Sequence, residues 1–258
     1  MISKSLIKGI RSLRLQKNRR EQGLFVAEGP KVVTEFISGP FRIKSIFAVE
    51  TFAEPLLQGD TKTEFVRISQ DELEKISMLK TPNQVLALVH LPEWGHSPPD
   101  APDDMLLVLD RISDPGNLGS IIRTADWFGI RDLVCSEHCV DIYNPKVVQA
   151  TMGSIARVKV SYCTLDEYLM KLQGKVVVYG AALEGNNLYL QKFPKKAIIV
   201  IGSESHGISS NLHPYISSMI TIPGSKDQPG TGPESLNASV AAALICSEFR
   251  RQNDFLSG

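Results

Sequence analysis

Residues 105–128 read MLLVLDRISDPGNLGSIIRTADWF, and this stretch decides the fold class of the chain. The run Met105–Leu109 is continuously apolar, which is typical of a strand buried on both faces of a parallel sheet. A polar Pro-Gly turn follows, and a largely apolar helical pattern extends over Gly116–Phe128. In open α/β sheets, ligands bind outside the carboxyl ends of the strands. The turn after Leu109 is therefore a candidate ligand site.

The same strand-to-helix pattern recurs along the rest of the chain. Asn144-Pro145 and Thr164-x-x-Glu167 predict helix starts, the second as a capping box, and a last helix is expected over 235–251. The alternation predicts a mostly parallel α/β sheet. Its further strands are expected at Asp132–Cys135, Val158–Ser161, Val176–Tyr179 and Ala197–Ile201.

A proline-rich stretch divides the chain. Residues 92–104 contain four prolines and little apolar content, as expected of a stiff linker. We therefore predict a first domain over 1–91 and a second over 105–258. Helical and strand patterns also alternate in the first domain, with a capping box at Ser69-x-x-Glu72 and a basic helix over 2–20, so a small α/β domain is expected.

Composition narrows the class of protein. Of the 258 residues, 43% are apolar and 22% are charged, which is enough to build cores and argues against disorder. No apolar run approaches the length of about 18 residues that a membrane span needs. The four cysteines form no C-x-x-C pair, so free thiols in a reducing cytoplasm are expected. Cys135-Ser-Glu-His138-Cys139 lacks a second ligand cluster, so we predict a buried thiol and no metal site.

Two more polar segments follow predicted strands. Residues 198–208 read IIVIGSESHGI and nearly match a phosphate-binding loop, but Ile208 replaces the essential lysine, which argues against a nucleotide hydrolase. The other segment starts at Ile220–Gly224 and continues to an alanine-rich helix after Glu234. Each segment also has a purely structural interpretation. Asn117 would be an ordinary helix cap with Arg123 a solvated side chain, 202–207 a tight turn, and the last helix a well-capped core helix.

The order of the three segments is more specific than any one of them. D-P-x-N-x-G-x-x-x-R, then I-G-S-E-x-x-G-I, then I-P and S-L-N-x-S-V-A, resembles the SpoU (TrmH) family of RNA 2′-O-ribose methyltransferases in the SPOUT superfamily. The resemblance covers residues 105–251. The opening Phe25-Val-Ala-Glu28-Gly29 is similar to the RNA substrate-binding domain that often precedes this catalytic domain.

The resemblance implies a fold, a cofactor and a site. It implies a deep trefoil knot at the C-terminal end of the sheet, a homodimer formed through the methyltransferase domain, and S-adenosylmethionine bound by Gly202, Ile222 and Leu236. The run from Gly224 to Glu234 is about five residues longer than the family pattern. The implied catalytic residue is Arg123, held in place by Asn117, and the implied supporting polar residues are Asn117, Glu204, Ser235 and Asn237.

The expected partner is RNA, first ribosomal RNA and second transfer RNA. The rival from another class is a non-catalytic RNA-binding module that kept the fold. Although the net charge is zero, residues 1–20 hold seven basic and no acidic side chains. We predict RNA-phosphate contacts there. A solvated amphipathic face and an organellar targeting peptide are the alternatives. The predicted RNA-binding residues are Arg14, Lys17, Arg19 and Arg20.

Overall fold

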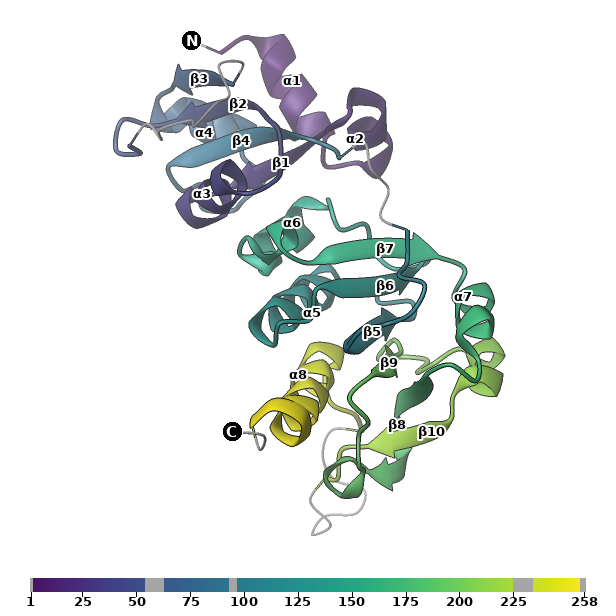
Figure 1. The fold of residues 1–258 in the computed structure, drawn as a ribbon. Coiled ribbons are helices and arrows are strands. Elements are labelled where there is room, and N and C mark those ends of the chain that lie inside the picture. The colour runs from purple at the N-terminus through teal and green to yellow at the C-terminus, as the bar shows by residue number, and fades with distance from the viewer. Residues whose placement is uncertain (1, 54–62, 93–96, 225–233, 256–258) are drawn as a thin grey trace. The chain divides into compact units, whose positions relative to one another are not determined.

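The computed structural model describes residues 2–53, 63–92, 97–224 and 234–255, which form two compact units (Figure 1). The first unit comprises Met1–Gly95 and Asp141–Arg157, and the second comprises His96–Val140 and Val158–Gly258. The break near residue 95 falls in the predicted linker. Asp141–Arg157 groups with the first unit by its contacts, although it lies inside the predicted second domain.

The first unit is built on a four-stranded sheet in the order β1-β4-β2-β3. β4 is antiparallel to both of its neighbours, and β2 and β3 are parallel. Its elements are α1 (Lys4–Ser12), α2 (Gln16–Gln22), β1 (Leu24–Glu28), α3 (Pro30–Ser38), β2 (Ile43–Ala48), β3 (Glu64–Arg67), α4 (Gln70–Ile76), β4 (Val85–His90), α6 (Pro145–Thr151) and the 3-10 turn η1 (Ser154–Ala156).

Two apolar layers hold this sheet. Ile10 of α1 and Leu73 of α4 belong to one buried cluster with residues of β1, β2 and β4, so these two helices cover the same face of the sheet. The second layer is aromatic: the Phe25 ring lies 5.7 Å from Phe36 and 4.8 Å from Tyr143, measured between ring centroids. The capping box at Ser69 is present as predicted. A small α/β domain is therefore what the first unit forms.

The single basic helix expected over 2–20 is instead two helices. α1 ends at Ser12, and α2 begins at Gln16. The physical reason is Arg19, whose Nη1 donates to the carbonyl oxygens of Leu13 (2.8 Å) and Arg14 (2.9 Å). Carbonyls at the end of a helix have no partner within the helix, and a side-chain donor can supply one. A bonding pattern between residues six apart is not visible in a helical periodicity.

The second unit contains a six-stranded sheet in the order β10-β8-β9-β5-β6-β7, and every neighbouring pair is parallel. The predicted mostly parallel α/β sheet is confirmed. Its elements are β5 (Met105–Leu109), α5 (Pro115–Trp127), β6 (Asp132–Ser136), β7 (Lys159–Cys163), α7 (Leu165–Leu172), β8 (Val177–Asn187), η2 (Leu188–Leu190), β9 (Ala197–Ile201), η3 (Ser210–Tyr215), β10 (Ser218–Thr221), α8 (Ala238–Arg250) and the π-helical turn η4 (Arg251–Phe255).

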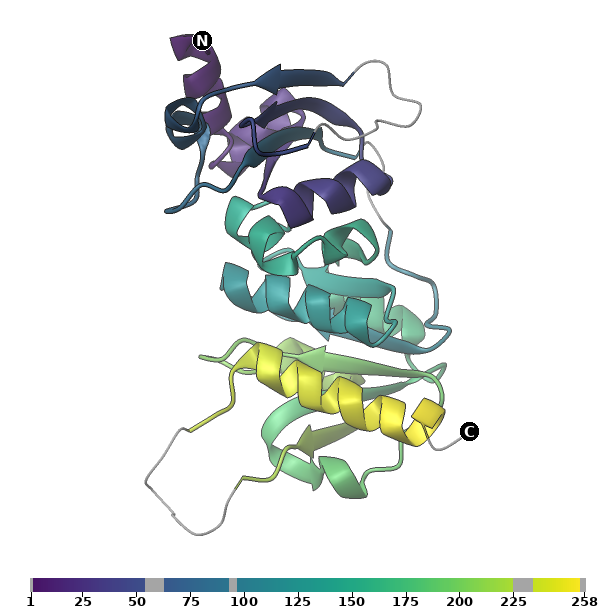
Figure 2. The same ribbon diagram turned by 90° about the vertical axis from the view of Figure 1, so that its left-hand side faces the viewer.

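Helices cover both faces of this sheet. Leu169 of α7 and Leu212 of η3 pack with alternate residues of the central strands, including Val108 and Val200, in one buried cluster. The other face carries α5 and α8, which lie side by side (Figure 2). Continuous burial of β5 and β9 follows from this double cover.

Two local predictions for the second unit were wrong. β8 extends to Asn187, well beyond the predicted 176–179, because its polar second half pairs with the edge strand β10. For the last helix, expected to open at Ser235 or Asn237, the structure selects Asn237, which caps α8 at Ala238. Thr164 precedes α7 without a side-chain capping bond, so the second capping box does not form. Pairing partners and competing caps are tertiary facts that local patterns do not contain.

Candidate active site

The candidate site lies at the ends of two neighbouring strands from which the chain continues toward opposite sides of the sheet. β5 and β9 pair along their full length, and each continues into one of the first two motifs. After β5 the chain turns toward β6, whereas after β9 it turns toward β10 at the far edge of the sheet. Such a switch point is where open α/β sheets place their ligands. The polar turns after Leu109 and Ile201 therefore lie where the topology predicts a ligand site.

Hydrogen bonds join the three motifs at this point. The Asn117 Nδ2 donates to Glu204 Oε1 (2.9 Å), and the Asn237 Nδ2 donates to Asn117 Oδ1 (2.8 Å). The same Glu204 oxygen accepts from the backbone N–H of Ala238 at 3.0 Å. The first turn of α8 thus meets both strand-end loops. Asn117 thus forms one polar network with Glu204, 87 positions away along the chain, and Asn237, 120 positions away.

Asn117 is not the helix cap that the structural interpretation of its segment assumed. Asp114 caps α5, and its Oδ1 accepts from the Asn117 N–H at 2.8 Å. With that task taken by Asp114, the Asn117 side chain is available for Glu204 and Asn237. Asn237, in contrast, does cap its helix, because its Oδ1 accepts from the Ser239 N–H at 2.9 Å. It combines this role with the contact to Asn117.

The turn after β9 closes tightly on itself, which explains its first glycine. The Gly207 N–H donates to the Ser203 carbonyl at 2.8 Å, and these two residues form an isolated bridge. A Cβ atom added to Gly202 would lie 2.2 Å from the Gly207 carbonyl carbon. Any side chain at 202 would therefore open the turn. The tight-turn interpretation is correct in geometry, but the turn also presents Glu204 to the network.

Arg123 lies apart from this network. It is exposed on the second half of α5 and, among the described residues, forms no hydrogen bond or ion pair. The prediction that Asn117 holds Arg123 in place is wrong, because the Asn117 amide is bonded on both sides by Glu204 and Asn237. Six residues along a helix correspond to about 600° of rotation, so the two side chains leave α5 in different directions. Its exposed guanidinium remains available to a ligand.

The other predicted site residues are placed as follows. Ser235 is exposed and has no hydrogen-bonding partner in the described part of the chain. Ile222 is half-buried just after β10, and Leu236 is 45% exposed immediately before the α8 cap. The predicted cofactor contacts therefore border the network through Gly202 and Leu236. Residues 225–233 of the lengthened segment lie outside the described residues.

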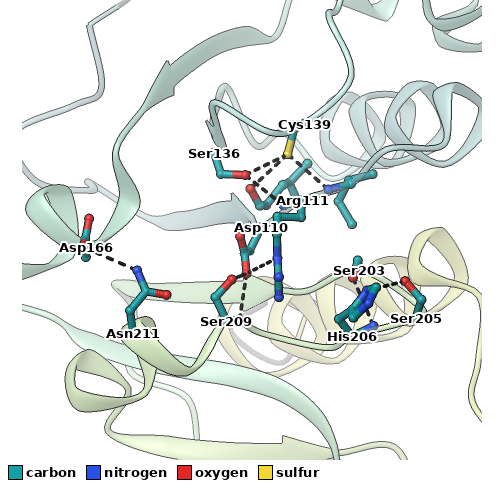
Figure 3. Close-up of polar contacts among 12 residues, drawn as sticks. Asp110, Arg111, Ser136, Cys139, Asp166, Ser203, Ser205, His206, Ser209 and Asn211 are labelled. Atoms are coloured by element: carbon teal, nitrogen blue, oxygen red, sulfur yellow. Dashed lines mark hydrogen bonds and ion pairs between the residues drawn. The ribbon is translucent and has the colours of Figure 1, made fainter.

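Sequence reasoning missed a second polar cluster at the same strand ends (Figure 3). Asp110 is only 3% exposed, and its Oδ2 accepts from the Ser209 N–H (2.8 Å) and Oγ (2.5 Å). The Arg111 Nε lies 3.5 Å from the same oxygen. A charged residue directly after a buried strand was the available signal for Asp110. Nothing in the sequence pointed to Arg111.

The end of β6 anchors the loop that contains Arg111. The Ser136 Oγ accepts from the Arg111 N–H at 2.9 Å, and the Cys139 Sγ accepts from the Ile112 N–H at 3.3 Å (Figure 3).

Hydrogen bonding with Cys135 lowers the pKa of the Cys139 thiol to about 7, although burial acts in the opposite direction. All four cysteines are free. In the described ranges no group of three or more His, Cys, Asp or Glu side chains has a metal-binding arrangement.

The basic N-terminal residues do not act alike. Arg14, Lys17 and Arg20 are exposed, whereas Arg19 is 2% exposed. Besides the two carbonyls, the Arg19 guanidinium bonds the Asp141 carboxylate, with its Nε at 3.1 Å. Arg19 is thus fully engaged in the first unit, and its prediction as an RNA-binding residue is wrong.

Within the described residues, no helix has the length and apolar character needed to cross a bilayer.

Comparison with known proteins gives a family for each part of the chain. The model of the SpoU rRNA methylase family matches residues 104–247, and the model of the MRM3-like substrate-binding domain matches residues 4–87. A 23S rRNA guanosine-2′-O-methyltransferase of Bacillus subtilis is 29% identical and covers 95% of this chain and 95% of its own length. These matches include all three motifs and the basic N-terminal segment.

Solved structures agree with the sequence comparison. A TrmH-family protein from Porphyromonas gingivalis has 37% identity and a TM-score of 0.83, over 98% of this chain and 99% of that one. The SpoU methyltransferase AviRb of Streptomyces viridochromogenes, solved with S-adenosylmethionine, has a TM-score of 0.81 over 99% of this chain and 100% of that one. At 23% identity it supports the fold alone. The SpoU model alone spans more than half of the chain, and this protein therefore belongs to the SpoU rRNA methylase family, as the three motifs predicted.

Proposed function

We propose that this protein transfers a methyl group from S-adenosylmethionine to a ribose 2′-hydroxyl of ribosomal RNA. The observation that carries the proposal is the Asn117–Glu204–Asn237 network, which joins the three family motifs at the switch point between β5 and β9. Family membership supports the RNA methyltransferase activity and its cofactor, and the Bacillus subtilis relative supports ribosomal over transfer RNA. Transfer RNA remains the second candidate substrate.

The cofactor site fits the residues around the network. Gly202 begins the turn after β9, and Leu236 offers an exposed apolar side chain next to Asn237 of the network. Ile222 completes the predicted contacts from the end of β10. S-adenosylmethionine supplies an already activated methyl group when bound. The protein therefore has only to hold the two reactants in line and to ease proton loss from the 2′-hydroxyl.

Arg123 is proposed to assist that proton loss without acting as a base. Arginine side chains are poor general bases, because a guanidinium does not give up its proton in proteins. From the exposed face of α5, Arg123 would bind the ribose oxygen and the adjacent phosphate, and so stabilise the negative charge that develops on the oxygen. The network of Asn117, Glu204 and Asn237 would fix the start of α5 against the turn after β9. Ser235 is proposed to contact the reactants from beside the α8 cap.

The decisive experiment maps the methyl group. Ribosomal RNA and transfer RNA from cells that lack the protein are incubated separately with purified protein and isotopically labelled S-adenosylmethionine, then digested and analysed by mass spectrometry. We expect one labelled 2′-O-methyl nucleotide that is absent from RNA of the deletion cells and present in wild-type RNA. Label only in transfer RNA would select the second substrate. No label in either RNA would support the rival hypothesis of a non-catalytic RNA-binding module.

The exposed basic residues Arg14, Lys17 and Arg20 are proposed to contact RNA phosphates. Their replacement together by glutamine should weaken RNA binding. The slope of the logarithm of the binding constant against the logarithm of the salt concentration should become flatter by about 2, because three counterion-releasing contacts are lost. Binding at several salt concentrations measures this slope. Replacing Lys171, Lys175 and Lys195, exposed on the other unit, removes the same charge and serves as control. Equal slopes for the two triple variants would contradict the assignment.

Assembly and location are further parts of the proposal. Trp127 on α5 is 84% exposed and Val240 on α8 is 46% exposed, and these two helices pack together. We propose that this face forms a homodimer of the methyltransferase domain, and a monomer at micromolar concentration in sedimentation equilibrium would contradict it. The family's trefoil knot and a cytoplasmic location are proposed as well. A crystal structure tests the knot, and cell fractionation tests the location.

A further inference from the structure

We propose that Arg111 is a substrate-binding residue of this site and holds a phosphodiester of the RNA beside the carboxyl ends of β5 and β9. It lies two residues after the end of β5, and Asp110 beside it donates its N–H to the Ile201 carbonyl at the end of β9. Arg111 therefore lies at the strand ends from which the first two motifs start. This inference deepens the proposed function and rests on it.

The backbone of Arg111 is held in a conformation that arginine rarely adopts. Its φ angle is +57°, in the left-handed region that favours glycine. Three bonds impose it: Arg111 N–H to Ser136 Oγ (2.9 Å), Ile112 N–H to Cys139 Sγ (3.3 Å) and Val140 N–H to the Ile112 carbonyl (2.9 Å). Such strain persists only where the surroundings impose it, and it is concentrated at functional sites. A glycine here would relieve the strain, so the arginine side chain needs another explanation.

The side chain is only partly engaged by the protein. Its Nε faces Asp110 Oδ2 at 3.5 Å without forming a hydrogen bond, and that oxygen already accepts two bonds from Ser209. Among buried side-chain nitrogen and oxygen atoms of the described residues, the Arg111 Nε alone has no hydrogen-bonding partner. The side chain as a whole is 36% exposed. Asp110 thus fixes the direction of the guanidinium, while its donors remain available to a ligand.

A phosphodiester is the ligand that matches these donors. Arginine presents a planar fork of N–H groups that binds phosphate oxygens in pairs, and a partly buried guanidinium binds them more strongly than a fully solvated one. The turn after β9 contributes Ser203, Ser205 and His206, which carry no negative charge (Figure 3). The carboxylate of Glu204 in that turn accepts hydrogen bonds from Asn117 and Ala238.

The other anion near this site would be the carboxylate of S-adenosylmethionine. Arg111 belongs to the loop that leads into α5 and Arg123, and not to the segments that contain Gly202, Ile222 and Leu236. We therefore assign it to RNA. Arg123 and Arg111 would then hold the substrate from the exposed face of α5 and from the loop before it.

The test compares Arg111→Gly with Arg131→Gly. Glycine tolerates the positive φ, so the first variant removes the guanidinium and relieves the strained backbone at once. Arg131 is an exposed arginine just before β6, at the amino end of the strands and so away from the proposed site, and its replacement removes the same charge. For both variants, binding of ribosomal RNA from deletion cells is measured at several salt concentrations. S-adenosylmethionine binding is measured by calorimetry, and thermal unfolding checks the fold.

For Arg111→Gly we expect about tenfold weaker RNA binding and a salt slope flatter by about 0.7 to 1, with unchanged cofactor affinity and a melting temperature no lower than that of the wild type. Arg111→Lys should recover part of the affinity. Unchanged RNA binding in Arg111→Gly, or the same change in Arg131→Gly, would overturn the proposal. Weaker cofactor binding with normal RNA binding would assign Arg111 to the cofactor carboxylate instead. Because RNA binding is measured without turnover, a failure of the methyltransferase proposal itself would show separately, as absent methylation by the wild type.

Discussion

Replacing Arg123 by alanine should lower the rate of methyl transfer at saturating RNA by at least about 100-fold and leave the affinity for S-adenosylmethionine unchanged. The guanidinium is exposed on α5 and has no protein partner among the described residues, so its loss should leave the fold intact. In our model its positive charge acts only as the 2′-hydroxyl loses its proton. Single-turnover kinetics with excess protein separate this chemical step from RNA binding.

Two further variants make this result specific. Arg123→Lys keeps the charge but loses the planar fork, so it should recover only part of the rate. Arg131→Ala removes an exposed arginine at the amino end of β6, away from the carboxyl ends that carry the proposed site, and should retain the wild-type rate. Near-normal turnover by Arg123→Ala with intact cofactor binding would remove Arg123 from the mechanism and leave proton handling to another group.

Replacing Arg19 by methionine should lower the free energy of unfolding by about 3 kcal/mol, because it breaks a buried, multiply bonded ion pair. Its guanidinium bonds the Leu13 and Arg14 carbonyls and the Asp141 carboxylate, and the side chain is 2% exposed. Methionine fills similar volume, so the loss measures the bonds rather than a cavity. Urea denaturation followed by far-ultraviolet circular dichroism gives the value.

The neighbouring arginine provides the matched control. Arg20→Met removes the same charge from the exposed face of α2 and should change stability by less than about 0.5 kcal/mol. The two variants should behave in opposite ways toward RNA, with Arg20→Met weakening binding and Arg19→Met leaving the affinity of the folded protein unchanged. Wild-type stability in Arg19→Met, together with weaker RNA binding, would restore Arg19 as an RNA contact.

The same pair of residues shows where sequence reasoning stops. Arg19 and Arg20 are indistinguishable as basic residues at the end of an amphipathic pattern. What separates them is Asp141, which lies 122 positions away along the chain and becomes a neighbour only in the folded first unit. The local pattern likewise indicated that Asn117 caps a helix or holds Arg123. In the structure Asp114 caps the helix, and the Asn117 amide forms hydrogen bonds with Glu204 and Asn237 instead.

The sequence by itself determined the parallel α/β sheet, the position of the three polar motifs after its strands, and the family. Continuous apolar runs have few alternatives to buried parallel strands, and three short motifs in a fixed order are specific even where each alone is weak. Only the tertiary structure decided which polar side chains meet. It joined Asn117, Glu204 and Asn237, separated Arg123 from them, buried Arg19 and gave Arg111 a φ of +57° beside Asp110. The reason is physical, since hydrogen-bond partners are chosen by distance in space, and contacts across 87 to 122 residues leave no periodic trace in the chain.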